Sequence, residues 1–69
     1  MQKKYFVSRE AKSSGVHEVH DQTCRWLPAS ENRVFLGEHL SCHTAILEAK
    51  RYYKQVDGCK RCSLACHKQ

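Results

Sequence analysis

The chain has 69 residues, with 12 Lys and Arg against seven Asp and Glu, a formal net charge of +5 and a mean hydropathy of −0.70. A chain this short forms one domain, residues 1–69, and buries too little apolar surface to be comfortably stable without a disulfide, a metal or a partner. No stretch approaches the roughly 20 apolar residues of a membrane span. We therefore expect a monomeric domain without membrane contact, whose basic charge permits an acidic partner but does not require one.

The five cysteines offer the staple that so small a domain needs. Residues 1–4 lead into only three apolar residues, Tyr5, Phe6 and Val7, which is too short for the core of a signal peptide. An odd number of cysteines also leaves one thiol over in any pairing scheme. We therefore expect a reduced, cytoplasmic setting, in which clustered Cys and His bind zinc more often than they form disulfides. Disulfides and plain core thiols are the alternatives.

Three segments have the composition of strands. Residues 4–8 are aromatic and β-branched, and a turn at residues 13–15 follows them. Residues 16–20 alternate and end at His20, and residues 32–36 form a third strand that closes at Gly37. These segments predict a small three-stranded antiparallel sheet.

One amphipathic helix follows, with Ser41 as its N-cap. Its apolar stripe consists of Cys42, Ala45, Ile46, Ala49 and Tyr53. We expect the helix to run to residue 54 or 55, with Cys42 as a small buried core residue, and Asp57-Gly58 to reverse the chain afterwards. The predicted fold class is α+β: the sheet, one main packed helix and a zinc-knuckle C-terminus, with residues 16–67 as the metal-binding module.

The strongest motif is Cys59-Lys60-Arg61-Cys62. Two-residue spacing lets both thiolates of a tight turn reach one ion, and Cys24 is the next candidate ligand. A redox dithiol is the alternative reading. That motif normally opens a helix after a strand in a βαβ unit, and the sequence shows no such unit.

The fourth ligand is contested. His20 precedes Cys24 with three residues between them, so a bend can aim both side chains at one ion, and we favour a Cys₃His zinc site of His20, Cys24, Cys59 and Cys62. Cys66 stands at the same spacing from Cys62 and would complete an all-cysteine site instead. His67 is a weaker third candidate.

The motif order resembles a known family. The string His20-x-x-x-Cys24-Arg25-Trp26-Leu27, the strand 32–35, a helix with spaced alanines and Gly58-Cys59-Lys60-Arg61-Cys62 are similar to the N-terminal zinc module of the Ada-type DNA alkyl-phosphotriester repair protein. Small stand-alone Ada-like metal-binding domains of bacteria are a closer likeness still. The resemblance covers residues 16–62 and implies a small sheet, a packed helix and a zinc ion that joins two loops.

In the repair protein, the first member of this C-x-x-x-C pair is a zinc thiolate that accepts a methyl group. Here that position is His20, and an imidazole cannot take over thiolate chemistry. The resemblance therefore implies the ligand geometry rather than the reaction, and an alkyl-accepting thiolate is the least favoured hypothesis. The acidic residues have no spacing that suggests acid–base work, so we expect no conventional enzyme.

The leading hypothesis is a zinc-stabilised binding module. Four cations flank the motifs and could form one patch for DNA or RNA phosphates: Arg25, Lys60, Arg61 and Lys68. Scattered solvating charges are the alternative reading of the basic composition. A metal-dependent protein-interaction domain, with Tyr52, Tyr53 and Trp26 at its surface, is the other functional alternative. Trp26 and Leu27 are otherwise expected to pack beside the metal as anchors.

Overall fold

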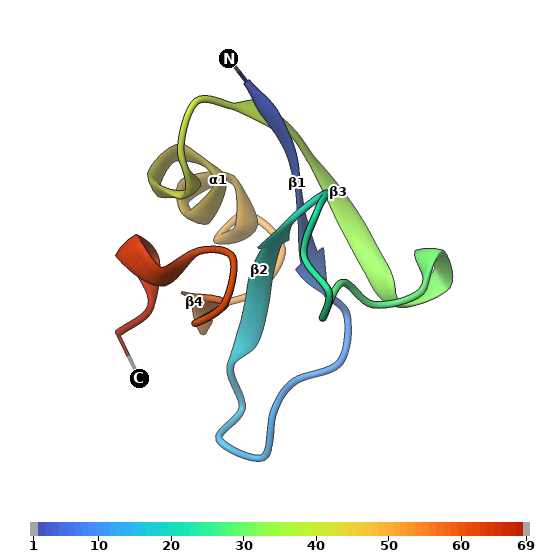
Figure 1. The fold of residues 1–69 in the computed structure, drawn as a ribbon. Helices are drawn as coiled ribbons and strands as arrows, with labels where there is room; N and C mark the ends of the chain where they lie inside the picture. The colour runs from blue at the N-terminus through green and yellow to red at the C-terminus, as the bar shows by residue number, and fades with distance from the viewer. Residues whose placement is uncertain (1, 69) are drawn as a thin grey trace.

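The computed structural model describes residues 2–68 and contains a four-stranded sheet with one α-helix (Figure 1). The strands are β1 (Lys3–Ser8), β2 (His17–Asp21), β3 (Arg33–His39) and β4 (Val56–Gly58), and the helices are η1 (Ser30–Asn32), α1 (Cys42–Ala49) and η2 (Leu64–Cys66). The sheet order is β3-β1-β2-β4. β1 is antiparallel to both of its neighbours, whereas β2 and β4 run parallel.

The α+β class is confirmed, but the predicted three-stranded antiparallel sheet is wrong in two respects. The sheet has a fourth strand, β4, and the pairing of β4 with β2 makes the sheet mixed. β4 is only three residues long, and its Asp57-Gly58 pair has the composition of a turn. Its extended form depends on pairing with β2, which lies almost 40 residues earlier in the chain.

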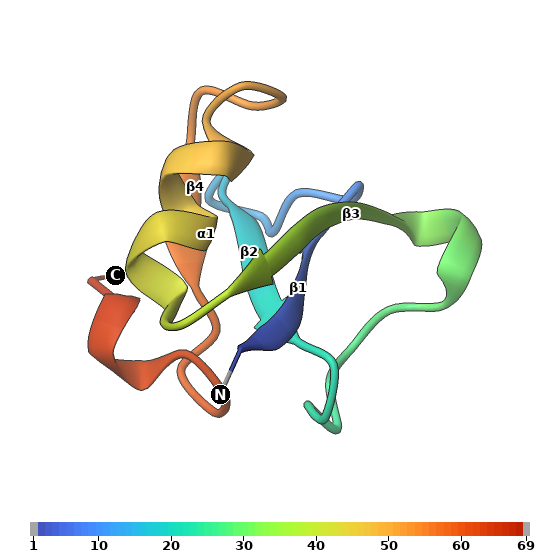
Figure 2. The same ribbon diagram turned by 90° about the horizontal axis from the view of Figure 1, so that it is seen from above.

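α1 covers one side of the sheet, and the connection between β2 and β3 lies on the other (Figure 2). Tyr5 and Val7 of β1 alternate toward the helix, where Val19 of β2 joins them. The buried core cluster comprises Tyr5, Val7, Val19, Leu36, Cys42, Ala45, Ala49 and Cys66. Within residues 2–68, Val7 and Val19 are the largest side chains with no appreciable exposure, so the interior is thin. No helix within residues 2–68 combines the length and apolarity needed to cross a bilayer.

The helix ends earlier than predicted, at Ala49 rather than at residue 54 or 55. The backbone N–H groups of Tyr52 and Tyr53 both donate to the Ala49 carbonyl, at 2.9 and 3.1 Å, so the chain leaves the helix in tight turns. It must straighten there, because the Gln55 carbonyl accepts a 2.9 Å bond from His17 N–H as β4 comes alongside β2. Tyr53 still packs against the core, and its ring stacks on His17 with the centroids 3.7 Å apart.

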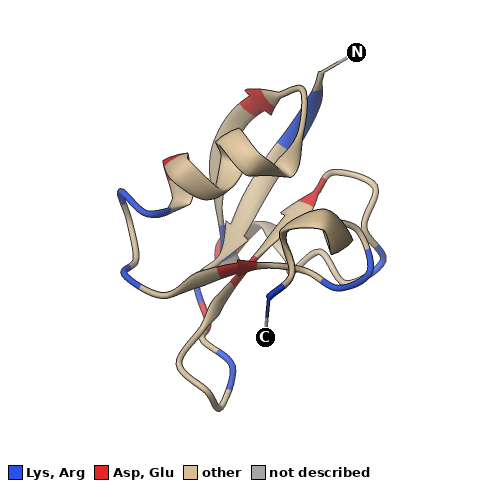
Figure 3. Cartoon of the chain, turned by 90° about the vertical axis from the view of Figure 1, so that its left-hand side faces the viewer, with Lys and Arg blue, Asp and Glu red and all other residues tan. Residues whose placement is uncertain are grey.

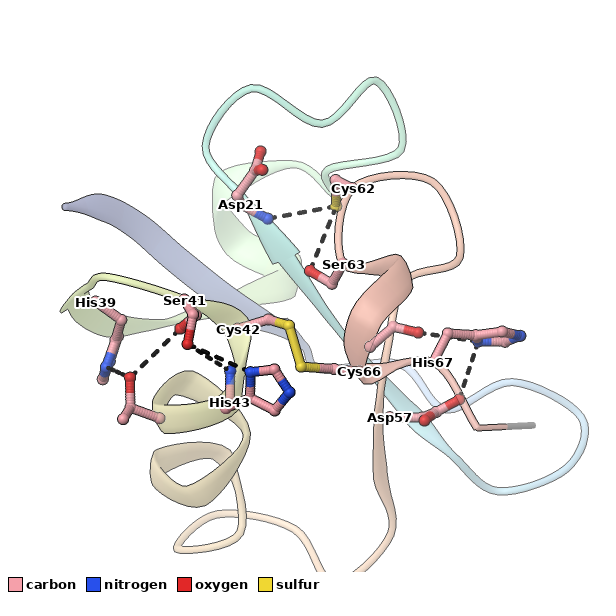
Figure 4. Close-up of a disulfide and its surroundings, with 12 residues drawn as sticks. Asp21, His39, Ser41, Cys42, His43, Asp57, Cys62, Ser63, Cys66 and His67 are labelled. Carbon is pink, nitrogen blue, oxygen red and sulfur yellow. Dashed lines mark hydrogen bonds and ion pairs between the residues drawn. A yellow bond between two sulfur atoms is a disulfide. The ribbon is translucent and has the colours of Figure 1, made fainter. Parts of the chain in front are cut away.

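The expectation that the cysteines do not pair is wrong for two of them, because Cys42 and Cys66 form a disulfide (Figure 4). Cys42 is buried in the core as predicted, at the first residue of α1. The turn of η2 brings Cys66 back to that point, with a Cα–Cα distance of 6.3 Å that lies within the usual disulfide range. Cys66 is therefore joined to Cys42 in this structure and lies outside the cluster of His20, Cys24, Cys59 and Cys62.

Candidate metal centre

The four residues that the sequence singled out as ligands lie together in the structure. The ligand atoms of His20, Cys24, Cys59 and Cys62 are all within 4.8 Å of one another. Cys24 Sγ is 3.5 Å from His20 Nδ1 and 3.8 Å from Cys59 Sγ, and Cys62 Sγ is 3.9 Å from His20 Nδ1. A group of one imidazole and three free thiols therefore converges on a single point.

Two of these three distances match the edges of a tetrahedron around a metal ion. With metal–sulfur bonds of about 2.3 Å and metal–nitrogen bonds of about 2.0 Å, tetrahedral ligands lie about 3.8 Å apart for two sulfurs and about 3.5 Å apart for sulfur and nitrogen. The separations of 3.8 Å between Cys24 and Cys59 and 3.5 Å between Cys24 and His20 agree with these values, whereas the 3.9 Å between Cys62 Sγ and His20 Nδ1 is longer than the expected sulfur–nitrogen separation. The residues could thus hold one metal ion with little movement.

The parallel pairing of β2 and β4 places the first two ligands side by side. Val19 pairs with Gly58 in the parallel register, and Cys59 N–H donates to the Val19 carbonyl at 3.0 Å. One step further along both strands, His20 and Cys59 become neighbours on the face opposite the Val19 side chain. The strand that the sequence did not predict is therefore the element that builds this half of the site.

A tight turn at the end of β2 aims the third ligand. Asp21 Oδ1 accepts hydrogen bonds from Thr23 N–H at 2.8 Å and from the Thr23 hydroxyl at 2.7 Å. The Cys24 N–H closes the turn on the Asp21 carbonyl at 3.2 Å. Aspartate side chains stabilise turns in this way, and here the turn folds Cys24 back toward His20.

The Cys59–Cys62 loop is a compact turn that depends on Gly58. Ser63 N–H donates to the Cys59 carbonyl at 2.8 Å, and Cys66 N–H donates to the Ser63 carbonyl at 2.9 Å. A Cβ atom at Gly58 would lie 2.6 Å from the Ser63 carbonyl oxygen and 2.7 Å from Cys66 Cβ. The glycine is therefore required for close approach of the chain to itself.

Three donors point at the sulfurs of this loop. Arg61 N–H donates to Cys59 Sγ at 3.4 Å. Asp21 N–H donates to Cys62 Sγ at 3.4 Å, and the Ser63 hydroxyl lies 3.9 Å from the same sulfur (Figure 4). Such donors stabilise negative charge on sulfur and orient the ligands of a metal site. Asp21 thus supports two ligands: its carboxylate stabilises the turn that leads to Cys24, and its backbone N–H donates to Cys62 Sγ.

Burial shifts the acid–base behaviour of the cluster. It raises the pKa of the Cys24 and Cys62 thiols above their ordinary value. Burial also lowers the pKa of His20, against the opposing effects of the Glu18 and Asp21 carboxylates. A neutral imidazole with a free lone pair is the form that binds metal, whereas the two thiols must lose protons to do so.

The Nδ1 atom of His20 faces the sulfurs, so the other ring nitrogen faces outward. His20 Nε2 lies 3.9 Å from Glu18 Oε1, and Lys12 Nζ lies 3.4 Å from Glu18 Oε2. The first distance is longer than a hydrogen bond and represents electrostatic contact only. A carboxylate beyond a ligating histidine is a common support for its orientation in metal sites.

Three of the four predicted phosphate-binding cations border the centre. A hollow of about 770 Å³ is lined by Lys3, Asp21, Thr23, Cys24, Arg25, Trp26, Arg61 and Cys62. An adjoining hollow of about 400 Å³ adds Lys60 and shares Trp26 and Arg61 with the first. Lys68 lines neither of these hollows. Its backbone N–H instead donates to Asp57 Oδ1 at 2.9 Å.

Trp26 is not the buried anchor that the sequence predicted. Its side chain is 59% exposed, and the Arg61 guanidinium lies 5.8 Å from the ring centroid. Leu27, its neighbour, is half-buried. Tyr52 is exposed as well, but it lines neither hollow. Trp26 is therefore an accessible aromatic surface beside the metal cluster.

The remaining cations are distributed over several parts of the molecule. Figure 3 shows Lys and Arg on separate loops and strands rather than on one continuous face. Lys3 pairs with Asp21 at 3.7 Å, and Arg51 pairs with Glu48 at 3.2 Å. Much of the positive charge thus fits the scattered alternative, and the local concentration is at the hollow beside the cluster.

Sequence reasoning missed several supporting residues. Asp21 followed by Thr23 is a local turn signal that could have identified the carboxylate as the organiser of the Cys24 turn. Gly58 was identified as a turn residue, but its contact with Ser63 and Cys66 depends on the fold of the C-terminal segment. Glu18, in contrast, does have a local signal, because residues two apart in a strand share a face and Glu18 lies two residues before His20.

Comparisons of this chain with protein-family models, with curated proteins and with solved structures found no match. The resemblance to the Ada-type zinc module therefore stays a prediction, and the functional argument depends on the geometry of the centre.

Proposed function

We propose that this protein is a small binding module stabilised by one zinc ion, which His20, Cys24, Cys59 and Cys62 hold. The observation that carries the proposal is the convergence of the four ligand atoms, all within 4.8 Å of one another, with two of their separations at tetrahedral values. Three thiolates and one imidazole are a ligand set that suits zinc, and closed four-ligand sites of this kind are structural rather than catalytic.

The proposed role of zinc follows from what it would connect. The ligands come from the end of β2, the turn after it and the loop after β4. One ion would therefore clasp two segments about 35 residues apart in a domain whose core has two large, fully buried side chains. In metal-stabilised domains of this size, binding free energy is also folding free energy.

The test is metal stoichiometry by native mass spectrometry, with Co²⁺ as the spectroscopic probe. We expect a first equivalent with the absorption of a tetrahedral cobalt thiolate. We also expect loss of dispersed amide resonances when a strong chelator removes the metal. His20→Ala should weaken the first equivalent by at least about 100-fold, since loss of a supporting residue alone costs about 10–100-fold.

Two further variants separate loss of a ligand from loss of folding. His20→Cys should retain tetrahedral cobalt with an additional sulfur-to-metal absorption, and His43→Ala, an exposed histidine outside the four-ligand cluster, should leave the first equivalent unchanged. A metal-free chain that stays folded in chelator would overturn the proposal. Full cobalt affinity in His20→Ala would remove His20 from the ligand set.

A second part of the proposal concerns the partner. Arg25 and Arg61 line a hollow in which an exposed indole ring is available, and Lys3, which lines the same hollow, is paired with Asp21. Cations bind phosphates, and aromatic rings stack on bases, so this combination favours a nucleic-acid strand over a protein surface. We propose Arg25, Lys60 and Arg61 as phosphate contacts, with Lys68 at most a distant contributor because it lines neither hollow.

Trp26 is the single tryptophan of the chain, so its fluorescence reports on this hollow directly. We expect a short DNA or RNA oligonucleotide to quench it at low salt, with binding that weakens as salt rises. Lys60→Ala/Arg61→Ala should reduce the affinity about tenfold or more. Lys50→Ala/Lys54→Ala removes the same amount of charge at exposed positions after the end of α1, and it should change the affinity little. Absence of quenching at low salt, or equal effects of the two double variants, would contradict the nucleic-acid proposal.

A further inference from the structure

We propose that Cys42, Cys66 and His43 form a second metal site once the disulfide between the two cysteines is reduced. These three residues are a second cluster of ligand atoms that lie within 4.8 Å of one another, and none of them belongs to the first centre. In the structure the two sulfurs are joined, so the site exists only in the reduced protein.

The backbone already holds the cluster in a binding arrangement. Cys42 is the first residue of α1, His43 follows it, and η2 brings Cys66 to the same point (Figure 4). Ser41 fixes this corner, because its hydroxyl accepts a 3.3 Å bond from His43 N–H and lies 3.4 Å from His43 Nδ1.

Two contacts just after Cys66 also hold its segment: His67 Nδ1 lies 3.0 Å from the Gly58 carbonyl oxygen, and Lys68 N–H donates to Asp57 Oδ1 at 2.9 Å. The disulfide is therefore not the only contact that keeps η2 in place.

The local surroundings favour metal binding by the reduced thiols. A cysteine at a helix N-terminus has its thiolate stabilised by the helix, and Cys42 occupies that position. His43 is exposed to solvent, whereas Cys42 and Cys66 are each 6% exposed. Two thiolates and one imidazole suit a thiophilic ion such as Zn²⁺ and leave a fourth position for water, which is the pattern of an exchangeable rather than a closed site.

Reduction of the Cys42–Cys66 disulfide requires a two-electron reductant, and a dithiol supplies those electrons. The dithiol gives two electrons and two protons to the Cys42–Cys66 bond and becomes a disulfide itself, and two thiols remain in the protein. Zinc then binds both thiolates and the His43 imidazole, and two protons leave for solvent. Cys42 and Cys66 are each 6% exposed, so the reductant reaches their sulfur atoms through local opening of the single turn η2 against the contacts that hold it.

The experiment compares metal uptake by the oxidised and the reduced full chain, with a phosphine as the laboratory reductant. Native mass spectrometry should show one zinc equivalent in the oxidised protein and two in the reduced protein, the second bound more weakly. His43→Ala should weaken the second equivalent about tenfold or more and leave the first unchanged. Leu47→Ala, at an exposed position one turn further along α1, is the matched control and should weaken neither.

Alkylation mapping identifies the ligands. Saturation with the second equivalent should protect Cys42 and Cys66 from a thiol reagent, beyond the protection that the first equivalent gives to Cys24, Cys59 and Cys62. The inference is overturned if the reduced protein takes up one equivalent only. It is also overturned if a second equivalent persists undiminished in Cys42→Ser and His43→Ala. The cobalt spectrum of the first equivalent reports separately on the four-ligand centre, so failure of either site is distinguishable from failure of the other.

Discussion

At the scale of single residues, the centre depends on side chains that do not ligate metal. Asp21 organises the turn before Cys24 and donates its N–H to Cys62, so one residue connects both halves of the cluster. Gly58 permits the C-terminal turn to fold against the chain that carries Cys59. These residues determine where the sulfurs lie, although motif spacing alone assigns them no role.

We predict that Gly58→Ala destabilises the protein and weakens the metal site together. The added Cβ would meet backbone and Cys66 Cβ atoms at 2.6–2.9 Å, and overpacking of this kind costs about 1–3 kcal/mol. Chemical denaturation and a zinc competition titration measure the two effects.

Gly37→Ala is the matched control for this prediction. Gly37 has a φ of +94° and only a His39 ring atom at 3.7 Å, so its substitution strains the backbone without a clash. We expect it to cost about 1 kcal/mol of stability with unchanged zinc affinity. A Gly58→Ala protein with normal zinc affinity would show that the loop adjusts without moving its sulfurs.

At the scale of elements, the C-terminal segment is attached at both of its ends. β4 pairs with β2 just before Cys59, and the Cys42–Cys66 disulfide ties η2 to the start of α1. The metal-binding loop lies between these two attachments. A short helix and a three-residue strand thus hold a loop that has no extensive core of its own.

We predict that the double variant Cys42→Ala/Cys66→Ala is less stable than the oxidised protein by about 3 kcal/mol. The disulfide closes a loop with a sequence separation of 24, and loop-closure entropy of the unfolded chain gives that magnitude. The measurement is urea denaturation of both proteins, each loaded with one zinc equivalent. Coincident unfolding curves would show that the disulfide adds no stability once zinc is bound.

At the scale of the whole molecule, folding and metal binding are expected to be thermodynamically coupled, so that a change in one changes the other. Among the described residues, the buried core cluster contains eight residues, two of them cysteines, and its helix has eight residues. A single core in a domain of this size rarely supplies more than about 3–5 kcal/mol of stability. The disulfide and the metal are therefore both expected to raise the same small free energy of unfolding, each by holding the C-terminal segment in place.

We predict that zinc affinity falls steeply as pH decreases. Burial raises the pKa of the Cys24 and Cys62 thiols, so both are protonated in the metal-free protein at neutral pH and lose their protons to the metal. Lower pH thus favours the metal-free form, and the two protons displaced from Cys24 and Cys62 alone contribute about 100-fold per pH unit. The lowered pKa of His20 keeps its imidazole neutral at neutral pH, so it adds proton competition only in more acidic solution.

Zinc competition titrations between about pH 6.5 and about pH 8 measure this dependence, with circular dichroism of the same samples as the measure of folding. An affinity that does not vary with pH in this window would mean that the two thiols are already ionised without metal, contrary to the effect of their burial.

The sequence by itself determined the local features of this protein. The α+β class, three of the strands, the helix with its N-cap at Ser41 and the ligand candidates His20, Cys24, Cys59 and Cys62 follow from side-chain alternation, helical periodicity and motif spacing. Each of these signals lies within a few neighbouring residues, where propensity and periodicity act.

Only the tertiary structure decided what distant residues do to one another. Three features depend on residues that are 24 or more positions apart. β4 pairs with β2, the Cys42–Cys66 disulfide links α1 to η2, and the early end of α1 accompanies the hydrogen bond from His17 N–H to the Gln55 carbonyl. The exposure of Trp26 depends on the same long-range arrangement. Such contacts depend on the free energy of the whole packed chain. The sequence spacing of Cys66 is compatible with a metal ligand or with a cross-link, and the folded structure, which brings it against Cys42, favours the cross-link.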